Sequence, residues 1–171
     1  MKRLGLTPKR WLLTLHILFA SIMFGVTIAF LILSIAAANT DSEDILKACY
    51  NAMHVLADSS VRASTIGTVV TGILLSVMTG WGLFKFYWII VKELLTVVSI
   101  GIGIVGMYEW TLKAVTIVTA EGLDVWLNPS FTVNNGQLLA GIILQIISLA
   151  AMFAISVFKP WGQRKARTML G

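Results

Sequence analysis

The chain has 171 residues, of which 57% are hydrophobic and 12% are charged, with 13 lysines and arginines against 8 acids. Its mean hydropathy is +0.87. Because an average soluble domain is about 25% charged, this composition argues against an aqueous globular enzyme and a disordered chain. A nucleic-acid-binding protein would carry a continuous basic stripe, whereas here the positive charge gathers at the chain ends. The composition predicts an integral membrane protein whose partner is the lipid bilayer and which binds no nucleic acid.

The N-terminus begins like a secretory signal peptide, with basic residues before a long apolar run. The run from Trp11 to Ala38 is too long for a cleaved signal, whose apolar core has about 7–15 residues. We therefore expect a retained first membrane helix.

Four segments reach the length of about 20 mostly apolar residues that a membrane-spanning helix needs. We predict an all-α integral membrane four-helix bundle, a single domain over 1–171, with spans at about 11–37, 60–79, 86–110 and 137–158. The segments 38–59 and 111–136 would form a small extracytoplasmic helical cap, and 159–171 a cytoplasmic tail.

Two points about the cap stay open in the sequence. Residues 41–59 either continue into the second span as one protruding helix or break away from it near Ser59 and Ser60. In the second connection, the pairs Asn128-Pro129 and Asn135-Gly136 each indicate a turn.

The distribution of basic residues predicts the orientation, because cytoplasmic loops of membrane proteins carry an excess of lysine and arginine. One side of the predicted bundle holds no acid and these basic residues: Lys2, Arg3, Lys9, Arg10, Lys85, Lys159, Arg164, Lys165 and Arg167. The other side is mainly acidic, with Asp41, Glu43, Asp44, Asp58, Glu109, Glu121 and Asp124 against Lys47, Arg62 and Lys113. Both termini are therefore expected in the cytoplasm.

Glycines at helical spacing run through the predicted spans. The segment Gly101–Gly106 matches G-x-G-x-x-G, but that pattern binds a pyrophosphate only after a strand and at a helix start. Because this segment lies in mid-span among isoleucine and valine, we expect close helix packing instead. Similar ladders, at Gly72, Ser76 and Gly80 and at Gly25 and Ala29, would serve within the bundle or in a homo-oligomer.

Three ionisable residues fall inside the predicted spans at one depth. His16 lies five residues past Trp11, and Lys92 and Glu93 lie four and five residues past Trp88, about 6–7.5 Å into the membrane. An ionisable group inside a span is a candidate functional residue. The alternatives are that Lys92 reaches the interface to pair with Glu93 or a lipid phosphate, and that His16 is a packed histidine.

A second set of polar residues lies at the outer boundary of the second span. Tyr50, His54, Asp58 and Arg62 are spaced by four and would share one helix face. His54, Asp58 and Arg62 would bind a ligand such as an anionic head group, or the face would simply be solvated.

The two histidines, His16 and His54, would lie at opposite ends of the bundle, so one heme or one metal held by both is not expected. We predict no metal site. A copper site at Cys49, Met53 and His54 is disfavoured because the ring of His54 would point about 100° away from Met53.

Three short motifs resemble a bacterial membrane superfamily that includes the CopD-type copper-resistance proteins, the HemJ-type protoporphyrinogen oxidases and uncharacterised four-helix families. These motifs are Leu15-His16 followed by Ala20 and Gly25, Thr71-Gly72 before a tryptophan, and Trp88–Leu95 with its pattern W-x-x-x-K-x-x-L. From Trp11 to about Phe158 the pattern is most similar to the uncharacterised four-helix families. The resemblance implies a multi-pass protein of the bacterial cytoplasmic membrane.

In HemJ-like members the histidine of the first helix and the lysine of the third are associated with a bound heme. The resemblance therefore implies a heme b site at His16 and Lys92, with Glu93 beside them. This chain lacks the further histidines of those members, so Lys92, Met23 or water would supply the second axial ligand.

We therefore expect a small heme-associated redox protein of the membrane. His16 would be the axial ligand, Lys92 a second ligand, propionate partner or proton donor, and Glu93 would tune the charge of the lysine. The alternative is a non-enzymatic transporter, sensor or accessory subunit whose weakly polar helix faces line a cavity for a small molecule or ion. A third possibility is a purely structural membrane partner.

Overall fold

The structure, a computed structural model, describes residues 5–79 and 82–162. These residues contain no strand, and their elements build four helices that are long and apolar enough to cross a membrane. In chain order the elements are α1 (Leu6–Ala38), α2 (Glu43–Leu56), the π-helical turn η1 (Ala57–Val61), α3 (Arg62–Met78), α4 (Tyr87–Ile100), the π-helical turn η2 (Gly101–Gly106), α5 (Met107–Glu121), the 3-10 turn η3 (Gly122–Leu127) and α6 (Pro129–Phe158). The prediction of an all-α fold with four long apolar helices is confirmed.

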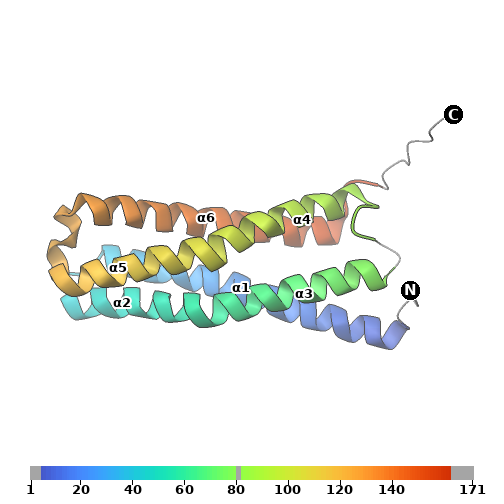
Figure 1. Cartoon of the computed structure of the whole chain (residues 1–171), viewed down its shortest axis with the longest axis horizontal. Coiled ribbons are helices and arrows are strands. Elements are labelled where there is room, and N and C mark those ends of the chain that lie inside the picture. Colours follow the sequence, from blue (N-terminus) through green and yellow to red (C-terminus); the bar gives the residue numbers. More distant parts are fainter. Residues whose placement is uncertain (1–4, 80–81, 163–171) are drawn as a thin grey trace.

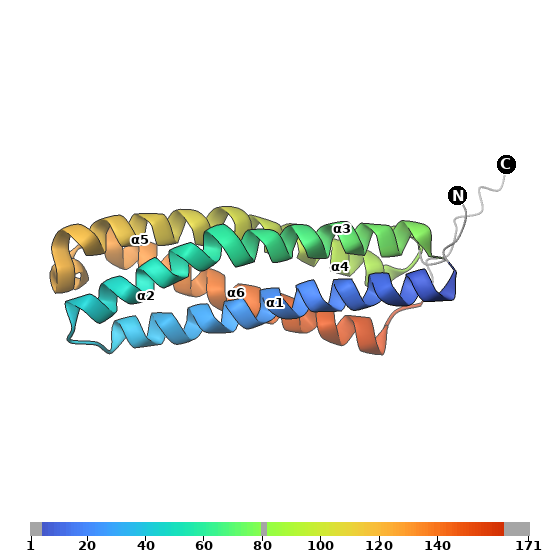
Figure 2. The same cartoon turned by 90° about the horizontal axis from the view of Figure 1, so that it is seen from below.

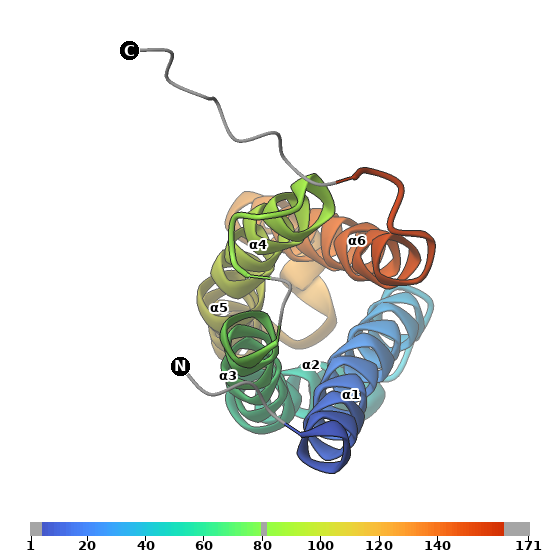
Figure 3. The ribbon, with the colours of Figure 1, turned by 90° about the vertical axis from the view of Figure 1, so that its right-hand side faces the viewer.

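The helices run side by side as one elongated bundle (Figure 1). We call the end where α1 begins and α6 ends the terminal end, and the opposite end the distal end. α1 packs against α2, α3 and α6, and α5 packs against α2 and α6 (Figure 2). At the terminal end α4 packs on α6 but makes almost no contact with α3, and these two helices lie apart when viewed along the bundle (Figure 3).

The second helix is continuous from Glu43 to Met78, with η1 inside it, so there is no break at Ser59 and Ser60. It has 36 residues, about 54 Å at 1.5 Å per residue, and therefore exceeds a hydrocarbon core of about 30 Å. The third helical run, Tyr87–Leu127, has 41 residues and exceeds it further.

The connection between the last two helices is much shorter than predicted. The third helix continues past Trp110 to Glu121. The chain then turns through η3 and Asn128 into α6. The chain turns at Asn128-Pro129 as predicted, and Asn128 caps α6, because its side chain accepts from the backbone N–H of Ser130 at 2.8 Å. The turn predicted at Asn135-Gly136 is wrong, since both residues lie inside α6.

The tightly packed core occupies the distal half and the centre of the bundle. Its largest fully buried side chains include Phe30, Tyr50, Met53, Met107 and Phe131. Tyr50 packs edge-to-face on Phe131, and its hydroxyl donates to Asn135 Oδ1 at 2.9 Å. This distal core holds the helices together, whereas the terminal half keeps several polar side chains between them.

Close helix packing at glycines occurs inside the bundle. A Cβ at Gly67 would lie 2.6 Å from the ring of Phe19, and one at Gly103 would lie 3.3 Å from Val61 Cγ1. By contrast, no heavy atom lies within 4 Å of the Cβ position at Gly25 or Gly101. The ladders thus serve partly within the bundle, and self-association through the open positions stays a prediction.

The indole of Trp110 depends on two glycines. A Cβ at Gly141 of α6 would lie 2.4 Å from Trp110 Cζ3, and a Cβ at Gly106, one turn before the tryptophan, would lie 2.7 Å from Trp110 Cη2. The backbone carbonyl of Trp110 also accepts a hydrogen bond from Asn134 Nδ2 of α6 at 2.8 Å. The contact between α5 and α6 is therefore built around this side chain.

We predict that Gly141→Ala destabilises the protein by about 1–3 kcal/mol, because the added methyl group displaces the indole. The matched control is Gly136→Ala in the same helix, where nothing lies within 4 Å of the new Cβ. That control should be neutral or stabilise by about 0.5–1 kcal/mol, since alanine is the better helix former. Thermal unfolding of both variants in detergent measures the difference. Equal melting temperatures would contradict the packing of Trp110 on α6.

Candidate functional site

His16 is held by the second helix rather than by its own. Its Nδ1 lies 2.9 Å from Thr71 Oγ1 of α3, and the ring lies against Gly72, where a Cβ would be 3.2 Å from Cε1. The imidazole is half-buried in the terminal half of the bundle. The pair Thr71-Gly72 therefore supplies both the hydrogen-bond partner and the space for the ring.

The short hydrogen bond of Thr71 within its own helix favours one tautomer of His16. A threonine hydroxyl has a single proton, and Thr71 donates it within its own helix, to the carbonyl of Gly67 at 2.6 Å. With its proton on that carbonyl, the hydroxyl oxygen accepts from His16, an arrangement in which Nδ1 is the protonated nitrogen of the neutral imidazole. In the neutral imidazole Nε2 then carries a free lone pair, as a metal ligand or proton acceptor requires.

Lys92 of α4 is anchored to α6. Its Nζ donates to Ser156 Oγ at 2.7 Å, and Ser156 donates its own proton to the carbonyl of Met152 at 2.7 Å. One turn along α4, Thr96 donates to the carbonyl of Lys92 at 2.8 Å. The half-buried ammonium group has two further protons, with which it can meet an anionic group.

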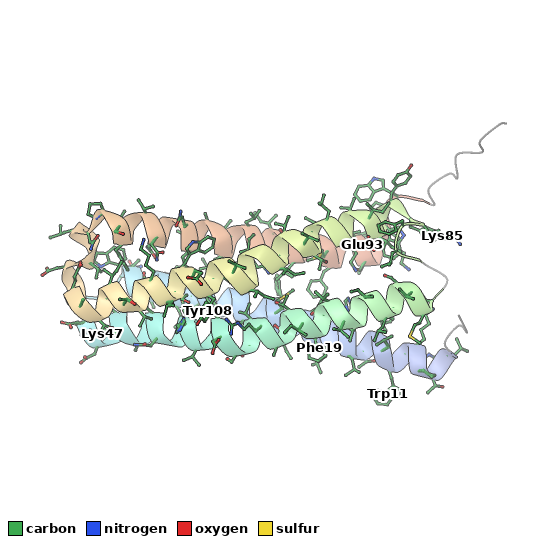
Figure 4. All side chains as sticks on the ribbon, viewed as in Figure 1. Trp11, Phe19, Lys47, Lys85, Glu93 and Tyr108 are labelled. Carbon is green, nitrogen blue, oxygen red and sulfur yellow. The ribbon has the colours of Figure 1, made fainter. Side chains whose placement is uncertain are left out.

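Glu93 does not act as the partner of Lys92. Its Oε1 is buried and has no hydrogen-bond partner among the described residues, and the lysine donates to Ser156 instead. Neighbouring residues on a helix point about 100° apart, which explains why the two side chains diverge. Glu93 belongs to the terminal half of the bundle, together with Trp11 and Lys85, whereas Lys47 lies at the distal end (Figure 4).

His16 on α1 and Lys92 on α4 both belong to the terminal half of the bundle, but they are held by different neighbours. His16 pairs with Thr71 of α3, and Lys92 pairs with Ser156 of α6. Met23, the other ligand considered for an iron, is buried two turns further along α1, and its sulfur accepts from Thr65 Oγ1 at 3.3 Å.

The polar residues His54, Asp58 and Arg62 of the second helix lie around Tyr108, a residue that the sequence pattern did not indicate. The ring of Tyr108 on α5 has its centroid 5.1 Å from that of His54, and Arg62 Cζ lies 4.4 Å from the centre of the same ring. Arg62 also pairs with Asp58 at 2.6 Å, and this pair is more than a third exposed on both sides. Such an exposed pair contributes at most about 1 kcal/mol to stability.

The prediction that Tyr50, His54, Asp58 and Arg62 share one helix face is wrong. Tyr50 is 1% exposed and belongs to the core, whereas Asp58 is exposed. The physical reason is the π-helical turn η1, which adds a residue between the two pairs and rotates the later pair relative to the earlier one. His54, Asp58 and Arg62 still lie near one another, because Tyr108 contacts both His54 and Arg62.

His54 repeats the arrangement of His16. Its Nδ1 lies 3.1 Å from Thr111 Oγ1, and Thr111 donates its own proton to the carbonyl of Met107 at 2.7 Å. The sequence pattern did not pair Thr71, Thr111 and Ser156 with His16, His54 and Lys92, because each hydroxyl lies on a different helix from its partner. No spacing within one helix can reveal such a contact.

The possible copper ligands do not converge. Cys49 is buried as a free thiol, and the sulfur of Met53 accepts from Ser34 Oγ at 3.5 Å. Within residues 5–79 and 82–162, no three histidine, cysteine, aspartate or glutamate side chains are close enough to hold a metal ion together. A heme iron can be bound by a single histidine, so a heme site needs no such cluster.

Comparison of the chain with models of known protein families, with curated proteins and with solved structures found no match.

Proposed function

We propose that the protein is a small membrane redox protein whose terminal half binds heme b, with Nε2 of His16 as the axial ligand. The observation that carries this proposal is the hydrogen bond between His16 Nδ1 and Thr71 Oγ1 at 2.9 Å. Protein histidines that bind a metal through one ring nitrogen commonly donate the other N–H to a fixed acceptor, which orients the ring. Thr71 provides this acceptor without any charge.

The other residues of the terminal half fit the chemistry of such a group. Lys92 carries a positive charge that can face the carboxylates of a porphyrin, and Ser156 holds that ammonium group in place. The buried Oε1 of Glu93 and Oγ1 of Thr68 have no partner among the described residues and can accept hydrogen bonds. When bound, heme supplies one-electron transfer, and the residues around it determine its orientation and its access to water.

The proposal predicts a Soret band that shifts on reduction when the protein is purified in mild detergent from heme-supplied cells. His16→Ala should abolish the band, because it removes the axial nitrogen. Thr71→Val should lower heme affinity by about 10–100-fold, the usual effect of losing a group that orients a metal ligand. Absorption spectra and heme titration measure both effects.

The matched control is His54→Ala, since His54 makes the same kind of hydrogen bond to a threonine in the distal half. This variant should keep the full band. Absence of a band in folded, heme-supplied protein, or a band that survives His16→Ala and disappears in His54→Ala, would overturn the heme proposal.

A second candidate function is a transporter, sensor or accessory subunit that binds a small molecule or ion between the helices. It is favoured by the buried polar side chains on all four helices, which include Thr27, Thr65, Ser99, Gln145 and Ser148. If the protein binds no heme, a solute that raises its melting temperature without adding a chromophore would support this function.

We also propose that the four helices cross a bacterial cytoplasmic membrane with both termini in the cytoplasm. Large aliphatic side chains lie exposed on the bundle, such as Leu94 and Val97 at 66% and Ile147 at 59%, and lipid would cover them. Among the described residues, the terminal end carries Lys9, Arg10, Lys85 and Lys159, whereas the distal end carries Asp41, Glu43, Asp44, Glu121 and Asp124. This asymmetry supports the orientation.

Cysteine labelling in intact cells tests the orientation. In a Cys49→Ala background, Leu127→Cys at the distal end and Phe84→Cys at the terminal end replace two exposed apolar residues, which are 84% and 66% exposed. We expect a membrane-impermeant maleimide to label Leu127→Cys in intact cells and Phe84→Cys only after permeabilisation. The reverse pattern would place both termini outside.

A further inference from the structure

An unpaired amide side chain lies in the middle of the bundle. Gln145 of α6 is 1% exposed, and neither its Nε2 nor its Oε1 has a hydrogen-bond partner among the described residues. Both atoms are strong hydrogen-bonding groups, and burying them unpaired is costly. Natural structures usually satisfy such groups with protein or with an ordered water molecule. The side chain therefore indicates a ligand.

Polar groups from two other helices surround the same point. A Cβ at Gly103 in η2 would lie 3.8 Å from Gln145 Nε2 and 3.8 Å from Thr65 Oγ1 of α3. Ser99, one turn before Gly103, is 1% exposed, and its Oγ also has no partner in the described chain. The hydroxyl of Thr65 donates only to the sulfur of Met23, a weak acceptor, and its oxygen can still accept.

The backbone at this level is irregular on both helices that face Gln145. The π-helical turns η1 and η2 contact each other, and Gly103 belongs to the second of them. π-helical turns inside α-helices are rare and occur frequently at functional sites. The absence of a side chain at Gly103 lets η2 approach Val61, Thr65 and Gln145 closely.

The chemistry of these groups selects a neutral ligand. Gln145 offers a donor and an acceptor, and the hydroxyls of Ser99 and Thr65 have the same dual character. The immediate neighbours named here carry no charge that could compensate a bound ion, and a cation would meet the amide N–H₂ as readily as the oxygen. We propose that Gln145, Ser99 and Thr65 form a buried site, beside Gly103, that binds water in the middle of the bundle.

This site does not depend on a cofactor at His16, and it gives the polar interior of the second candidate function a specific occupant. Thr68, one turn from Thr65 toward the terminal end, also has a buried hydroxyl oxygen without a partner in the described chain. The groups that can bind water thus continue from Gln145 in the direction of His16.

Solid-state nuclear magnetic resonance of the protein in lipid bilayers tests the site directly. In protein labelled uniformly with nitrogen-15, transfer of magnetisation from water should reach the side-chain amide of Gln145 early, as it reaches that of the exposed Gln137. Gln145→Leu assigns the signal, and Ser99→Ala should remove the early transfer. If the side-chain signal of Gln145 builds up as slowly as the backbone amides of the buried neighbours Ile142 and Leu149, the proposal is overturned.

A double-mutant cycle gives an independent readout in detergent. Where water bridges Gln145 and Ser99, the change in Tm of the pair Gln145→Leu and Ser99→Ala should differ from the sum of the single changes by about 2–4 °C. The control pair combines Gln145→Leu with Thr116→Val, an exposed threonine bonded to its own helix, and should be additive. Additivity in both pairs would show that the two buried groups share no ligand.

Discussion

A serine or threonine hydroxyl has one proton, and in this bundle that proton usually goes to the backbone carbonyl one turn earlier in the same helix. Thr71, Thr111 and Ser156 all follow this rule. Each of these hydroxyls also makes a hydrogen bond to a side chain of another helix, namely His16, His54 and Lys92. One hydroxyl thus joins the backbone of its own helix to a titratable group of a neighbouring helix.

The hydroxyl groups of Thr65 and Ser99 at the proposed central site do not donate to a backbone carbonyl of their own helix. Thr65 donates to a methionine sulfur instead of a carbonyl, and Ser99 and Gln145 have unpaired atoms within the described chain. These residues lie at the level of the two π-helical turns, where the regular one-turn spacing of donors and carbonyls is interrupted. The polar interior therefore differs along the bundle. The protein holds His16 and Lys92 in the terminal half, whereas Ser99 and Gln145 at the centre have polar atoms without a partner in the described chain.

The sequence was sufficient for the features that depend on composition and length. The apolar runs predicted four helices, and the turn at Asn128-Pro129 followed from local chemistry that needs no neighbouring helix. The shared face of Tyr50 and Asp58 could not be predicted correctly, because a π-helical turn changes the helical phase and leaves no clear mark in the residue pattern. The Asn135-Gly136 pair misled for a related reason, since Asn135 accepts from Tyr50 and the neighbouring Asn134 donates to Trp110, and both contacts keep the pair within a helix.

The contact between η1 and η2 limits how this chain can change in evolution. Each π-helical turn inserts an extra residue, and removing one residue from an α-helix rotates everything beyond it by about 100°. A deletion within Ala57–Val61 alone would turn Tyr50 and Met53 out of the distal core, while the facing helix kept its phase. Each of the two turns sets the rotation of its helix beyond the inserted residue. Sequences that share this bundle should therefore gain or lose both turns together.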